Sequence, residues 1–360
     1  MENLVIDPLF WKDRKVLITG HTGFKGGWLS HWLKNLGAHV NGYALPPNAE
    51  HSFYTQTSVS NSLLRNTFSD IRHLDTFKKA MQLAEPSIVI HLAAQPLVID
   101  SYLDPISTYS TNVMGVVNMF EAVRSCSSVK AVLNVTTDKC YENKEQLLGY
   151  QENDPMGGYD PYSSSKGCSE LVSASYRKSF FNDSGIALAT ARAGNVIGGG
   201  DWAKNRIIPD AMNAFANNEK LLIRNPNSIR PWQHVLEPLF GYLMLCQQLI
   251  NNPDAFSGAW NFGPKQEDTQ PVSVLADIIA ESWGDNAGWK HDNGEHPHEA
   301  NYLKLNCSKA KNILKWQPIW KLDQALDETV KWYKAFYNNK NMSKFTLEQI
   351  EKYSSYESAL

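Results

Sequence analysis

The 360-residue sequence lacks the features that would mark it as a membrane protein, a nucleic-acid-binding protein or a repeat protein. It has no apolar run of about eighteen residues, which a membrane-spanning helix requires. Its formal net charge of −3 gives no basic footprint for nucleic acid, and no internal repeat is visible. With 42% hydrophobic and 20% charged residues, its composition is typical of a globular protein. We therefore expect a small-molecule partner, and neither nucleic acid nor a membrane.

Cysteine is scarce. Five cysteines are present without any C-x-x-C pair: Cys126, Cys140, Cys168, Cys246 and Cys307. Their odd number and wide spacing indicate neither a disulfide framework nor a zinc or redox motif. The amino-terminal segment lacks the basic stretch and apolar run of a secretory signal. We expect reduced thiols in a cytoplasmic protein.

One histidine- and acid-rich segment resembles a metal site only superficially. Its members follow one another at irregular intervals beside glycine and proline: His291, Asp292, Glu295, His296, His298 and Glu299. Metal-binding motifs place their ligands at defined spacings, which this segment does not have. We predict a solvated loop there and no bound metal.

The most informative stretch, residues 16–29, reads VLITGHTGFKGGWL, a buried strand followed by a glycine-rich turn and a helix. Gly20 permits the tight turn, Gly23 permits close approach of a pyrophosphate, and Gly26 permits close packing of helix and strand. The helix amino terminus adds N–H groups and a positive dipole end. The alternative interpretation is that the three glycines belong to a surface loop that binds no phosphate. We expect this turn to cradle a dinucleotide through Gly20, Thr22, Gly23, Phe24 and Lys25.

Short β-rich runs alternate with helical patterns between residue 15 and about residue 200, which predicts a doubly wound, Rossmann-like parallel sheet. A helical stripe covers residues 112–124, and the polar segment 46–61 is predicted to be a loop. The predicted strands are Lys15–Thr19, His39–Leu45, Asn66–Asp70, Ser87–Ala93, Ala131–Thr136 and Ala187–Arg192.

The pattern becomes less regular after residue 195, where we expect a smaller, mixed α/β substrate domain. A helix at 241–251 and a strand at 259–263 are expected to return to the first domain. The predicted dinucleotide-binding domain is therefore residues 1–194 and 235–262. The predicted nucleotide-sugar domain is residues 195–234 and 263–360, and it ends in a polar tail, residues 338–360.

The second strand is followed by no acid of the kind that binds the adenosine ribose in a typical NAD site. Residues 35–64 also contain no Lys or Arg for the 2′-phosphate of NADP, so NAD is the predicted cofactor. For Asp70, after the third strand, the alternative is a turn residue without a ligand. For the small residues Ala93 and Ala94, after the fourth strand, the alternative is a role in packing alone. We expect these two strand ends to contact the cofactor through Asp70, Ile71, Ala93 and Gln95.

The candidate catalytic residues follow the fifth strand and begin the next helix. Tyr162 and Lys166 are four residues apart and share one helical face. A phenol with a reference pKa of about 10 is a poor base at neutral pH, but a neighbouring ammonium and a positive nicotinamide favour the phenolate. Such a pair removes a hydroxyl proton while hydride leaves the same carbon. Thr137, at the carboxyl edge of the sheet, is expected to hold that hydroxyl.

A Tyr-x-x-x-Lys spacing alone occurs by chance, but the glycine turn, Thr137, Tyr162 and Lys166 occur here in a consistent order. This combination resembles the extended short-chain dehydrogenase/reductases over nearly the whole chain. In that family, sugar-nucleotide 4,6-dehydratases have an Asp-Glu pair after the fifth strand, and 4-epimerases usually have no acid–base pair. The pair Asp138-Lys139, with ⁹³AAQPL and ²³⁰RPWQH, is similar to the dehydratases that act on CDP-glucose. Ile99-Asp100 departs from the pattern, because an arginine is expected soon after Pro-Leu-Val.

The resemblance implies oxidation at C4 by NAD, loss of water across C5 and C6, and return of hydride to C6. Tyr162 is then the base for oxidation, Asp138 the acid on the 6-hydroxyl, and Lys139 the candidate base at C5. The alternative for Lys139 is a charge partner of Asp138. The substrate residues implied are Asn195, Arg206, Arg230 and Asn261, and a surface charge is the alternative for each arginine.

The resemblance also implies a homo-oligomer, either a dimer or a tetramer. Two other functions remain open from the sequence. A nucleotide-sugar 4-epimerase shares Tyr162 and Lys166 but has no use for Asp138 as an acid. A non-catalytic dinucleotide-binding regulator needs only the glycine turn.

Overall fold

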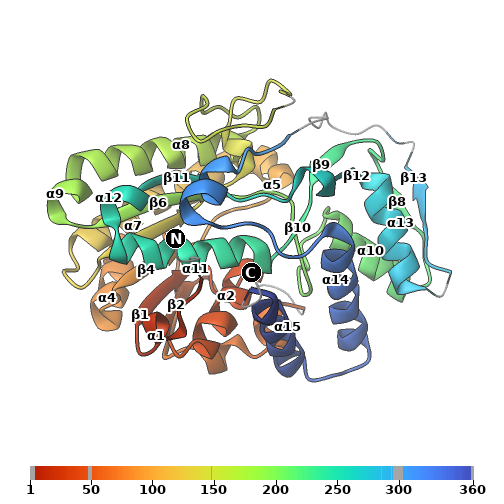
Figure 1. Cartoon of the computed structure of the whole chain (residues 1–360), viewed down its shortest axis with the longest axis horizontal. Coiled ribbons are helices and arrows are strands. Elements are labelled where there is room, and N and C mark those ends of the chain that lie inside the picture. Colours follow the sequence, from red (N-terminus) through yellow and green to blue (C-terminus); the bar gives the residue numbers. More distant parts are fainter. Residues whose placement is uncertain are drawn as a thin grey trace.

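The computed structural model describes residues 5–47, 51–146, 148–284, 286–292, 294 and 303–357. Within these ranges a seven-stranded sheet of order β11-β6-β5-β4-β1-β2-β3 forms the centre, and all its neighbouring strands are parallel (Figure 1). The predicted doubly wound sheet is confirmed. Its strands are β1 (Lys15–Thr19), β2 (His39–Ala44), β3 (Arg65–Phe68), β4 (Ile88–His91), β5 (Ala131–Val135), β6 (Ala187–Arg192) and β11 (Gly258–Asn261).

The central strands are apolar on both faces because helices cover both sides of the sheet. Every residue of β4, β5 and β6 is buried. Val16 and Ile18 belong to one hydrophobic core, and Leu17 between them belongs to the other. The strand order reverses between β1 and β4, and ligands of such sheets bind where the strand carboxyl ends meet this switch point.

Two layers of helices enclose the sheet. Residues of α2 (Phe24–Asn35) and α11 (Leu236–Asn251) contribute to one core. The other core contains residues of α4 (Leu74–Ala84) and α7 (Gly115–Arg124), and partly buried residues of α8 (Pro161–Tyr176) pack against it. Almost every residue of α11 is buried, which is expected of a helix that is apolar all round.

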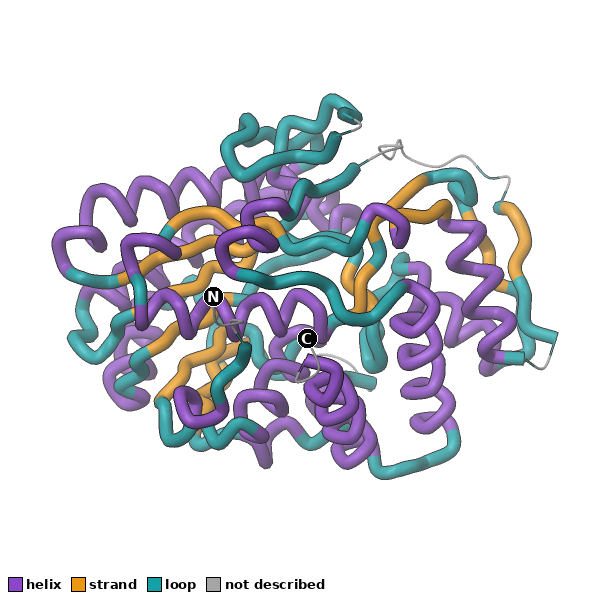
Figure 2. Tube along the Cα trace, in the orientation of Figure 1, coloured by secondary structure: helices purple, strands orange, loops and turns teal. Residues whose placement is uncertain are grey.

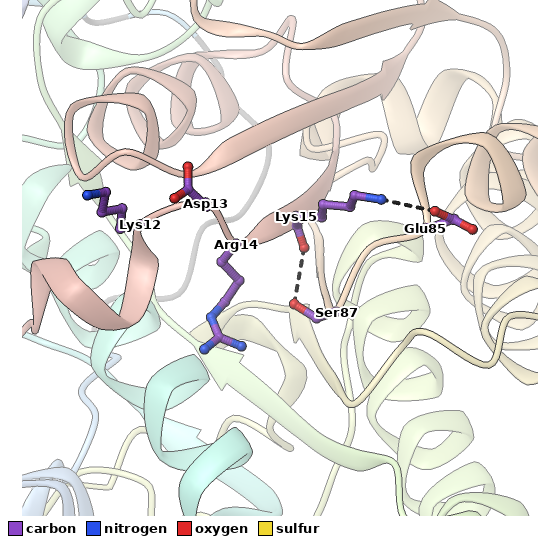
Figure 3. A pocket seen from close by; sticks show the side chains of 6 residues that line it. All are labelled: Lys12, Asp13, Arg14, Lys15, Glu85 and Ser87. Carbon is purple, nitrogen blue, oxygen red and sulfur yellow. Dashed lines mark hydrogen bonds and ion pairs between the residues drawn. The ribbon is translucent and has the colours of Figure 1, made fainter.

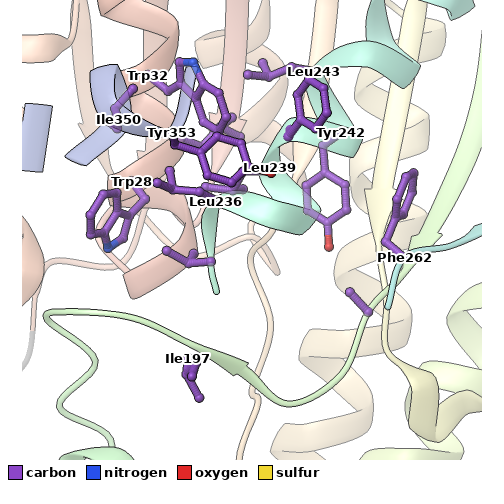
Figure 4. Packing of buried hydrophobic residues seen from close by; sticks show 14 of the residues in the cluster. Trp28, Trp32, Ile197, Leu236, Leu239, Tyr242, Leu243, Phe262, Ile350 and Tyr353 are labelled. Atoms are coloured by element: carbon purple, nitrogen blue, oxygen red, sulfur yellow. The ribbon is translucent and has the colours of Figure 1, made fainter. Parts of the chain in front are cut away.

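The predicted polar tail is wrong over residues 342–357, which form helix α15 (Met342–Glu357). Figure 4 shows Ile350 and Tyr353 of this helix beside Trp28 and Trp32 of α2. The ring centroids of Trp32 and Tyr353 are 5.6 Å apart. A few buried residues at helical spacing form a stripe that the polar composition hides: Met342, Thr346, Gln349, Ile350 and Tyr353.

The predicted loop 46–61 is also wrong in its second half. Helix α3 (Phe53–Gln56) and the 3₁₀ turn η1 (Val59–Ser62) lie there. Ser52 caps α3 by accepting a hydrogen bond of 3.2 Å from the N–H of Thr55. Phe53 and Val59 are buried beside α2, because Gly27 leaves room for the Phe53 ring. The segment reads as a loop because its helix-capping residues are polar, but its two apolar residues, Phe53 and Val59, are buried and hold it against α2.

A second region lies to one side of the sheet and is built from helices, short strands and long loops (Figures 1 and 2). Strands β9 and β12 pair antiparallel, and β8 and β13 pair parallel. Its elements are α10 (Ile207–Ala216), β8 (Leu221–Ile223), β9 (Ile229–Pro231), β12 (Thr269–Pro271), α13 (Val272–Trp283), β13 (Trp289–His291) and α14 (Leu322–Tyr337). The domain boundaries themselves stay a prediction.

The remaining elements are short and mostly connect those above. Among the helices that the structure describes, none combines the length and apolar character needed to span a bilayer. The short elements are α1 (Pro8–Trp11), α5 (Val98–Leu103), α6 (Pro105–Tyr109), η2 (Ser110–Met114), η3 (Asp138–Cys140), η4 (Arg177–Phe181), α9 (Asn182–Ser184), β7 (Val196–Ile197), β10 (Gln233–His234), α12 (Pro253–Phe256), η5 (Gln266–Asp268) and η6 (Ala310–Leu314).

Candidate active site

The glycine-rich turn between β1 and α2 is packed too tightly for side chains. Gly20 has φ +78°, and a Cβ there would lie 2.8 Å from the Ala93 nitrogen. A Cβ on Gly26 would lie 2.2 Å from the Gly20 carbonyl oxygen. Gly23 is the N-cap residue of α2 and supplies no side-chain cap. The tight turn and the close packing that the sequence predicts are both present.

This turn fits the diphosphate of a dinucleotide. The first N–H groups of a helix have no intrahelical partner, and no side chain at Gly23 covers those of α2. Such a helix end favours bound anions. Lys25 belongs to the first turn of the same helix and adds a cationic side chain. Thr22 is half-buried, and its hydroxyl donates a hydrogen bond of 2.9 Å to the Leu45 carbonyl.

Three cationic side chains approach one another at this edge of the sheet. The pKa of Lys25 is lowered to about 8, first by burial and then by the charges of Arg206 and Lys166. These residues come from α2, the start of α10 and α8. Asp138 and Asp201 act in the opposite direction on the same lysine, so they are neighbours of the cluster. A site of this charge suits a diphosphate group.

Tyr162 and Lys166 lie buried on α8, as their spacing predicts. The Asp160 carboxylate caps this helix by accepting a hydrogen bond of 2.9 Å from the N–H of Ser163. The Lys166 ammonium donates to the Val135 carbonyl oxygen at 3.2 Å, and burial lowers its pKa to about 8. The helix is thereby fastened to the end of β5.

The pKa of Tyr162 is raised, whereas the sequence reasoning expected neighbouring charges to favour the phenolate. Burial is the largest cause and raises this pKa to about 12. The hydrogen bond with Thr137 and the charge of Arg206 act in the opposite direction. The Lys166 ammonium is directed to Val135 instead. The hydrogen bond between Tyr162 and Thr137 brings together the two residues that the sequence predicts at the reacting hydroxyl.

The turn after β5 separates Asp138 from Lys139. Asp138 is only 1% exposed, and its Oδ1 accepts a hydrogen bond of 3.0 Å from the Thr137 hydroxyl. Its Oδ2 is buried and has no hydrogen-bond partner within the described residues. Lys139 is exposed, and of the ion pairs between described residues none joins it to Asp138. The alternative role of Lys139 as a charge partner of Asp138 therefore has no support in the geometry.

Two of the four predicted substrate residues lie near this turn. Arg206 influences the pKa of Tyr162 and forms an ion pair of 2.8 Å with Asp201. Asn195 has φ +48°, and its buried Nδ2 has no hydrogen-bond partner among the described residues. Arg230 is half-buried on β9, where it donates to the Ile229 carbonyl at 3.0 Å. Arg206 is therefore close enough for its charge to act on Tyr162, the predicted base.

Asn261 is fully buried and lies in a hydrogen-bond network with Tyr141. Its Oδ1 accepts a hydrogen bond of 2.7 Å from the Tyr141 hydroxyl. Its Nδ2 donates to the carbonyls of Tyr150 at 2.8 Å and Asn306 at 3.1 Å. Both amide hydrogens are therefore used within the protein. We accordingly omit Asn261 from the proposed substrate site.

The residues predicted at the adenosine side are engaged by the protein itself. The Asp70 carboxylate accepts a hydrogen bond of 2.6 Å from Arg72, which is the main cause of its lowered pKa. Ile71 is buried in the core. The Gln95 side chain donates to Thr108 at 2.9 Å and so fixes its own loop. Ala93 instead presents its backbone to Gly20.

Other predicted features lie away from the site. The departure at Ile99-Asp100 belongs to α5 and is exposed there. No potential metal-binding group of three or more His, Cys, Asp or Glu residues occurs among the described residues. Most of the histidine- and acid-rich segment lies outside the described residues: Glu295, His296, His298 and Glu299.

A hollow near the amino terminus of β1 is not part of the candidate active site (Figure 3). It lies at the opposite end of β1 from Gly20. Its charges are partly paired with one another, as in the 2.9 Å ion pair of Lys15 and Glu85. The residues that line it are Lys12, Asp13, Arg14, Lys15, Glu85 and Ser87.

Sequence patterns did not identify several residues that surround the turn η3, which carries the predicted acid Asp138. Glu170 and Arg192 form an ion pair of 2.8 Å, and both side chains are 4% exposed. A Cβ on Gly194 would lie 1.8 Å from the Asp138 Oδ2. Two features of the sequence could have pointed to this ion pair. Glu170 lies one helical turn after Lys166, and Arg192 is a charged residue at the end of a buried strand. The contact at Gly194 has no local signal.

A family profile, described as GDP-mannose 4,6 dehydratase, matches residues 17–329. The chain belongs to this dehydratase family. The family resemblance predicted from the motifs is therefore confirmed. This member of the family is 51% identical over 356 residues to CDP-glucose 4,6-dehydratase of Salmonella typhimurium, which covers 98% of this chain and 99% of that protein.

Solved structures share the fold of this 4,6-dehydratase family member. An epimerase of Methanothermobacter thermautotrophicus has a TM-score of 0.80 at 21% identity, over 93% of this chain and 96% of that one. A dTDP-glucose 4,6-dehydratase of Bacillus anthracis in complex with NAD has a TM-score of 0.74 at 19% identity, over 92% and 99% of the two chains. At these identities the structures show the common fold alone.

Proposed function

We propose that this protein is an NAD-dependent 4,6-dehydratase of a nucleotide-activated hexose, which converts CDP-glucose to CDP-4-keto-6-deoxyglucose and water. One observation carries the proposal. The buried Asp138 carboxyl lies beside Thr137, which also contacts Tyr162, so an acid and a hydroxyl-binding tyrosine share one site. The 51% identity to CDP-glucose 4,6-dehydratase of Salmonella typhimurium supports the choice of substrate.

In the first step, Tyr162 takes the proton of the C4 hydroxyl, which Thr137 helps to position. Lys166 holds the tyrosine helix against β5 through its hydrogen bond to the Val135 carbonyl. The charge of Arg206 acts to lower the pKa of the phenol. When bound, NAD accepts hydride from C4, returns it to C6, and brings a positive ring near the phenol. The residues proposed to hold NAD are those of the glycine-rich turn and the strand ends beside it, with the tyrosine and lysine of α8: Gly20, Thr22, Gly23, Phe24, Lys25, Ala93, Tyr162 and Lys166. The predicted contacts of Asp70, Ile71 and Gln95 would lie farther along the same cofactor.

In the second step, the C4 ketone makes the C5 proton acidic and water is lost. The neutral amine of Lys139 takes the C5 proton, and the protonated carboxyl of Asp138 gives its proton to the departing 6-hydroxyl. The step requires both residues to enter in their uncharged forms. In the third step, Lys139 returns a proton to C5 while hydride is added at C6. Asp138 regains a proton from Tyr162 by way of the Thr137 hydroxyl, which contacts both residues. The net products are therefore the 4-keto-6-deoxy sugar and one water, formed from the 6-hydroxyl and the C4 hydroxyl proton. Asp138 is therefore the residue that an epimerase does not need.

The second candidate function, a nucleotide-sugar 4-epimerase, shares Tyr162 and Lys166. The epimerase reaction gives no role to the buried carboxyl of Asp138 beside these two residues. A non-catalytic dinucleotide-binding regulator requires the glycine turn alone, and it leaves the buried Tyr162–Thr137 contact without a purpose. We retain these functions as outcomes of the assay described below.

Substrate recognition is assigned to three of the predicted residues. Arg206 lies near Tyr162, so it is placed to neutralise the substrate diphosphate. Asn195 offers an unpaired amide, and Arg230 supplies a further guanidinium from the second region. All five cysteines are free thiols, which agrees with a reducing compartment such as the cytoplasm.

We also propose that the protein forms a homo-oligomer, either a dimer or a tetramer. Large apolar side chains on adjoining elements are exposed, and their burial in a subunit interface would remove them from water. The residues that support this proposal are Tyr102, Leu103, Ile106, Met114 and Leu171, with exposures of 54%, 80%, 81%, 52% and 61%.

The activity is tested with purified protein, a catalytic amount of NAD, and CDP-, UDP-, dTDP- and GDP-glucose in separate reactions. The expected product is the 4-keto-6-deoxy sugar, formed fastest from CDP-glucose. A product that is only the C4 epimer would contradict the dehydratase proposal. Stoichiometric accumulation of NADH would indicate an ordinary dehydrogenase.

A further inference from the structure

The turn that carries Asp138 and Lys139 is held at both of its ends. Before the turn, the Thr136 hydroxyl donates a hydrogen bond of 2.5 Å to Glu170 Oε1. After the turn comes Tyr141, whose side chain is fully buried. Its hydroxyl accepts a hydrogen bond of 2.7 Å from Arg192 and donates one of 2.7 Å to Asn261.

The two anchors belong to one buried network. Glu170 Oε2 accepts hydrogen bonds from Arg192 at 2.8 Å and from Thr190 at 2.7 Å. Arg192 therefore links the anchor before the turn to Tyr141 after it. Glu170 lies one helical turn after Lys166 on α8, so the network also joins the turn to the helix of Tyr162.

The Tyr141 side chain is held by its ring as well as by its hydroxyl. Its ring stacks on Tyr150 with centroids 5.0 Å apart, and the Arg192 guanidinium lies 4.9 Å above it. Burial raises the pKa of Tyr141, so its hydroxyl stays neutral and can both accept and donate. The residue immediately after η3 is thus fixed in distance and direction.

We infer that Tyr141 is a positioning residue for water elimination, because it fixes the far end of the turn that presents Asp138 and Lys139. The inference rests on the proposed dehydratase function. Tyr162 and Lys166 hold their positions through Thr137 and Val135, at the near end of the turn. Tyr141 therefore serves the elimination step and leaves C4 oxidation largely unaffected.

The space around Asp138 explains why a small shift matters. Gly194 lies against its carboxylate, and a Cβ there would be 1.8 Å from Oδ2. The carboxyl group consequently has no free room on that side. A misplacement of about 1 Å in a reacting group costs on the order of 10²-fold in rate. Release of the turn at Tyr141 would move Asp138 relative to the 6-hydroxyl.

The test is a single turnover of Tyr141→Phe with NAD and CDP-glucose, followed by near-ultraviolet absorbance of the reduced nicotinamide. Phenylalanine keeps the stacked ring and removes only the hydroxyl. We expect the absorbance to rise at the wild-type rate. Its decay should be slower by about 10- to 10²-fold, because oxidation precedes the impaired elimination. The ratio of the two rates comes only from active molecules, so a partly folded preparation does not change it.

Tyr150→Phe is the matched control. The Tyr150 hydroxyl also has two hydrogen bonds in the same ring stack, from the Lys144 N–H at 2.5 Å and to Asn143 at 2.9 Å. Among the hydrogen bonds of the described residues, none joins this hydroxyl to residues 137–140 or to Arg192. We expect both phases of this variant to match the wild type, which separates loss of a buried hydroxyl from loss of the anchor.

Three results would overturn the inference: unchanged decay in Tyr141→Phe, equal slowing of both phases, or the same slow decay in Tyr150→Phe. Each presupposes that the wild-type protein makes the keto product. Failure of the wild type to make that product from any of the four nucleotide sugars would instead reject the proposed function. The two failures are therefore distinguishable in one set of reactions.

Discussion

Gly194 and Asp138 are in such close contact that a Cβ on the glycine would lie 1.8 Å from the aspartate Oδ2. Gly194→Ala therefore forces the carboxylate or the backbone to move. We expect the rate of keto-product formation to fall by about 10²-fold, since reacting groups tolerate little misplacement. The dissociation constant for NAD should stay close to that of the wild type. Steady-state rates and NAD titration check both expectations.

Gly263→Ala is the control for that substitution. A Cβ there would meet its nearest neighbour, the Cys307 sulfur, at 3.4 Å, which is ordinary van der Waals contact. We expect wild-type turnover from this variant. Wild-type turnover from Gly194→Ala as well would show that the position of Asp138 is unimportant.

Tyr162→Phe removes the proposed base and one hydroxyl group. Loss of a general base costs on the order of 10²–10⁴ in rate. The ring still fills its buried position, so the melting temperature and the affinity for NAD should change little. Rates, thermal unfolding and NAD titration test these expectations together. Turnover close to that of the wild type would remove Tyr162 from the mechanism.

Asp138→Asn separates elimination from oxidation. Asparagine has nearly the same size but cannot protonate the 6-hydroxyl. Tyr162, Lys166 and Thr137 remain, so C4 oxidation should proceed. Reduced nicotinamide should then accumulate after mixing with CDP-glucose and disappear slowly. Rapid-mixing absorbance measures both phases, and normal turnover without the transient would return the epimerase to consideration.

The pH dependence of stability follows from four buried histidines. Burial lowers the pKa values of His21 and His31 to about 4, and those of His91 and His234 to about 3. Between about pH 6.5 and these values the unfolded chain binds more protons, so stability falls as pH falls. Glu237, whose pKa burial raises to about 7, acts in the opposite direction, as do Asp210 and Asp268, whose pKa values burial also raises. We expect lower unfolding free energy at pH 5 than at pH 7.

Urea unfolding of His31→Asn at the two pH values isolates one contribution. His31 is 2% exposed, whereas the control His73→Asn alters an exposed residue. The decrease from pH 7 to pH 5 should be about 2 kcal/mol smaller in His31→Asn than in the wild type. The same decrease in wild type and His31→Asn would show that His31 takes up its proton without unfolding.

The sequence was sufficient where local physics decides the outcome. The strands Lys15–Thr19 and Ala187–Arg192 were predicted with their observed bounds, because each is a short, buried β-rich run. The turn at Gly20 and the shared face of Tyr162 and Lys166 depend on nearby residues, so they too were predictable.

Features that depend on distant residues were not predictable. Helix α15 reads as a polar tail, because its burial against Trp32 depends on a partner some three hundred residues away, as in the Trp32–Tyr353 contact. The ion pair of Glu170 and Arg192 joins a helix to a strand. Asn261 was expected at the substrate, yet its amide is used by Tyr141 and neighbouring carbonyls. Such contacts become visible only when the chain is folded.

The central claim is that hydrogen removed at C4 is delivered to C6 within one active site. CDP-glucose carrying deuterium at C4 tests it in a reaction with unlabelled NAD and wild-type protein. Mass spectrometry and NMR of the product locate the label. We predict a 4-keto-6-deoxy sugar with the deuterium on C6. Deuterium retained at C4 of an epimerised sugar, or released in free reduced cofactor, would contradict the account.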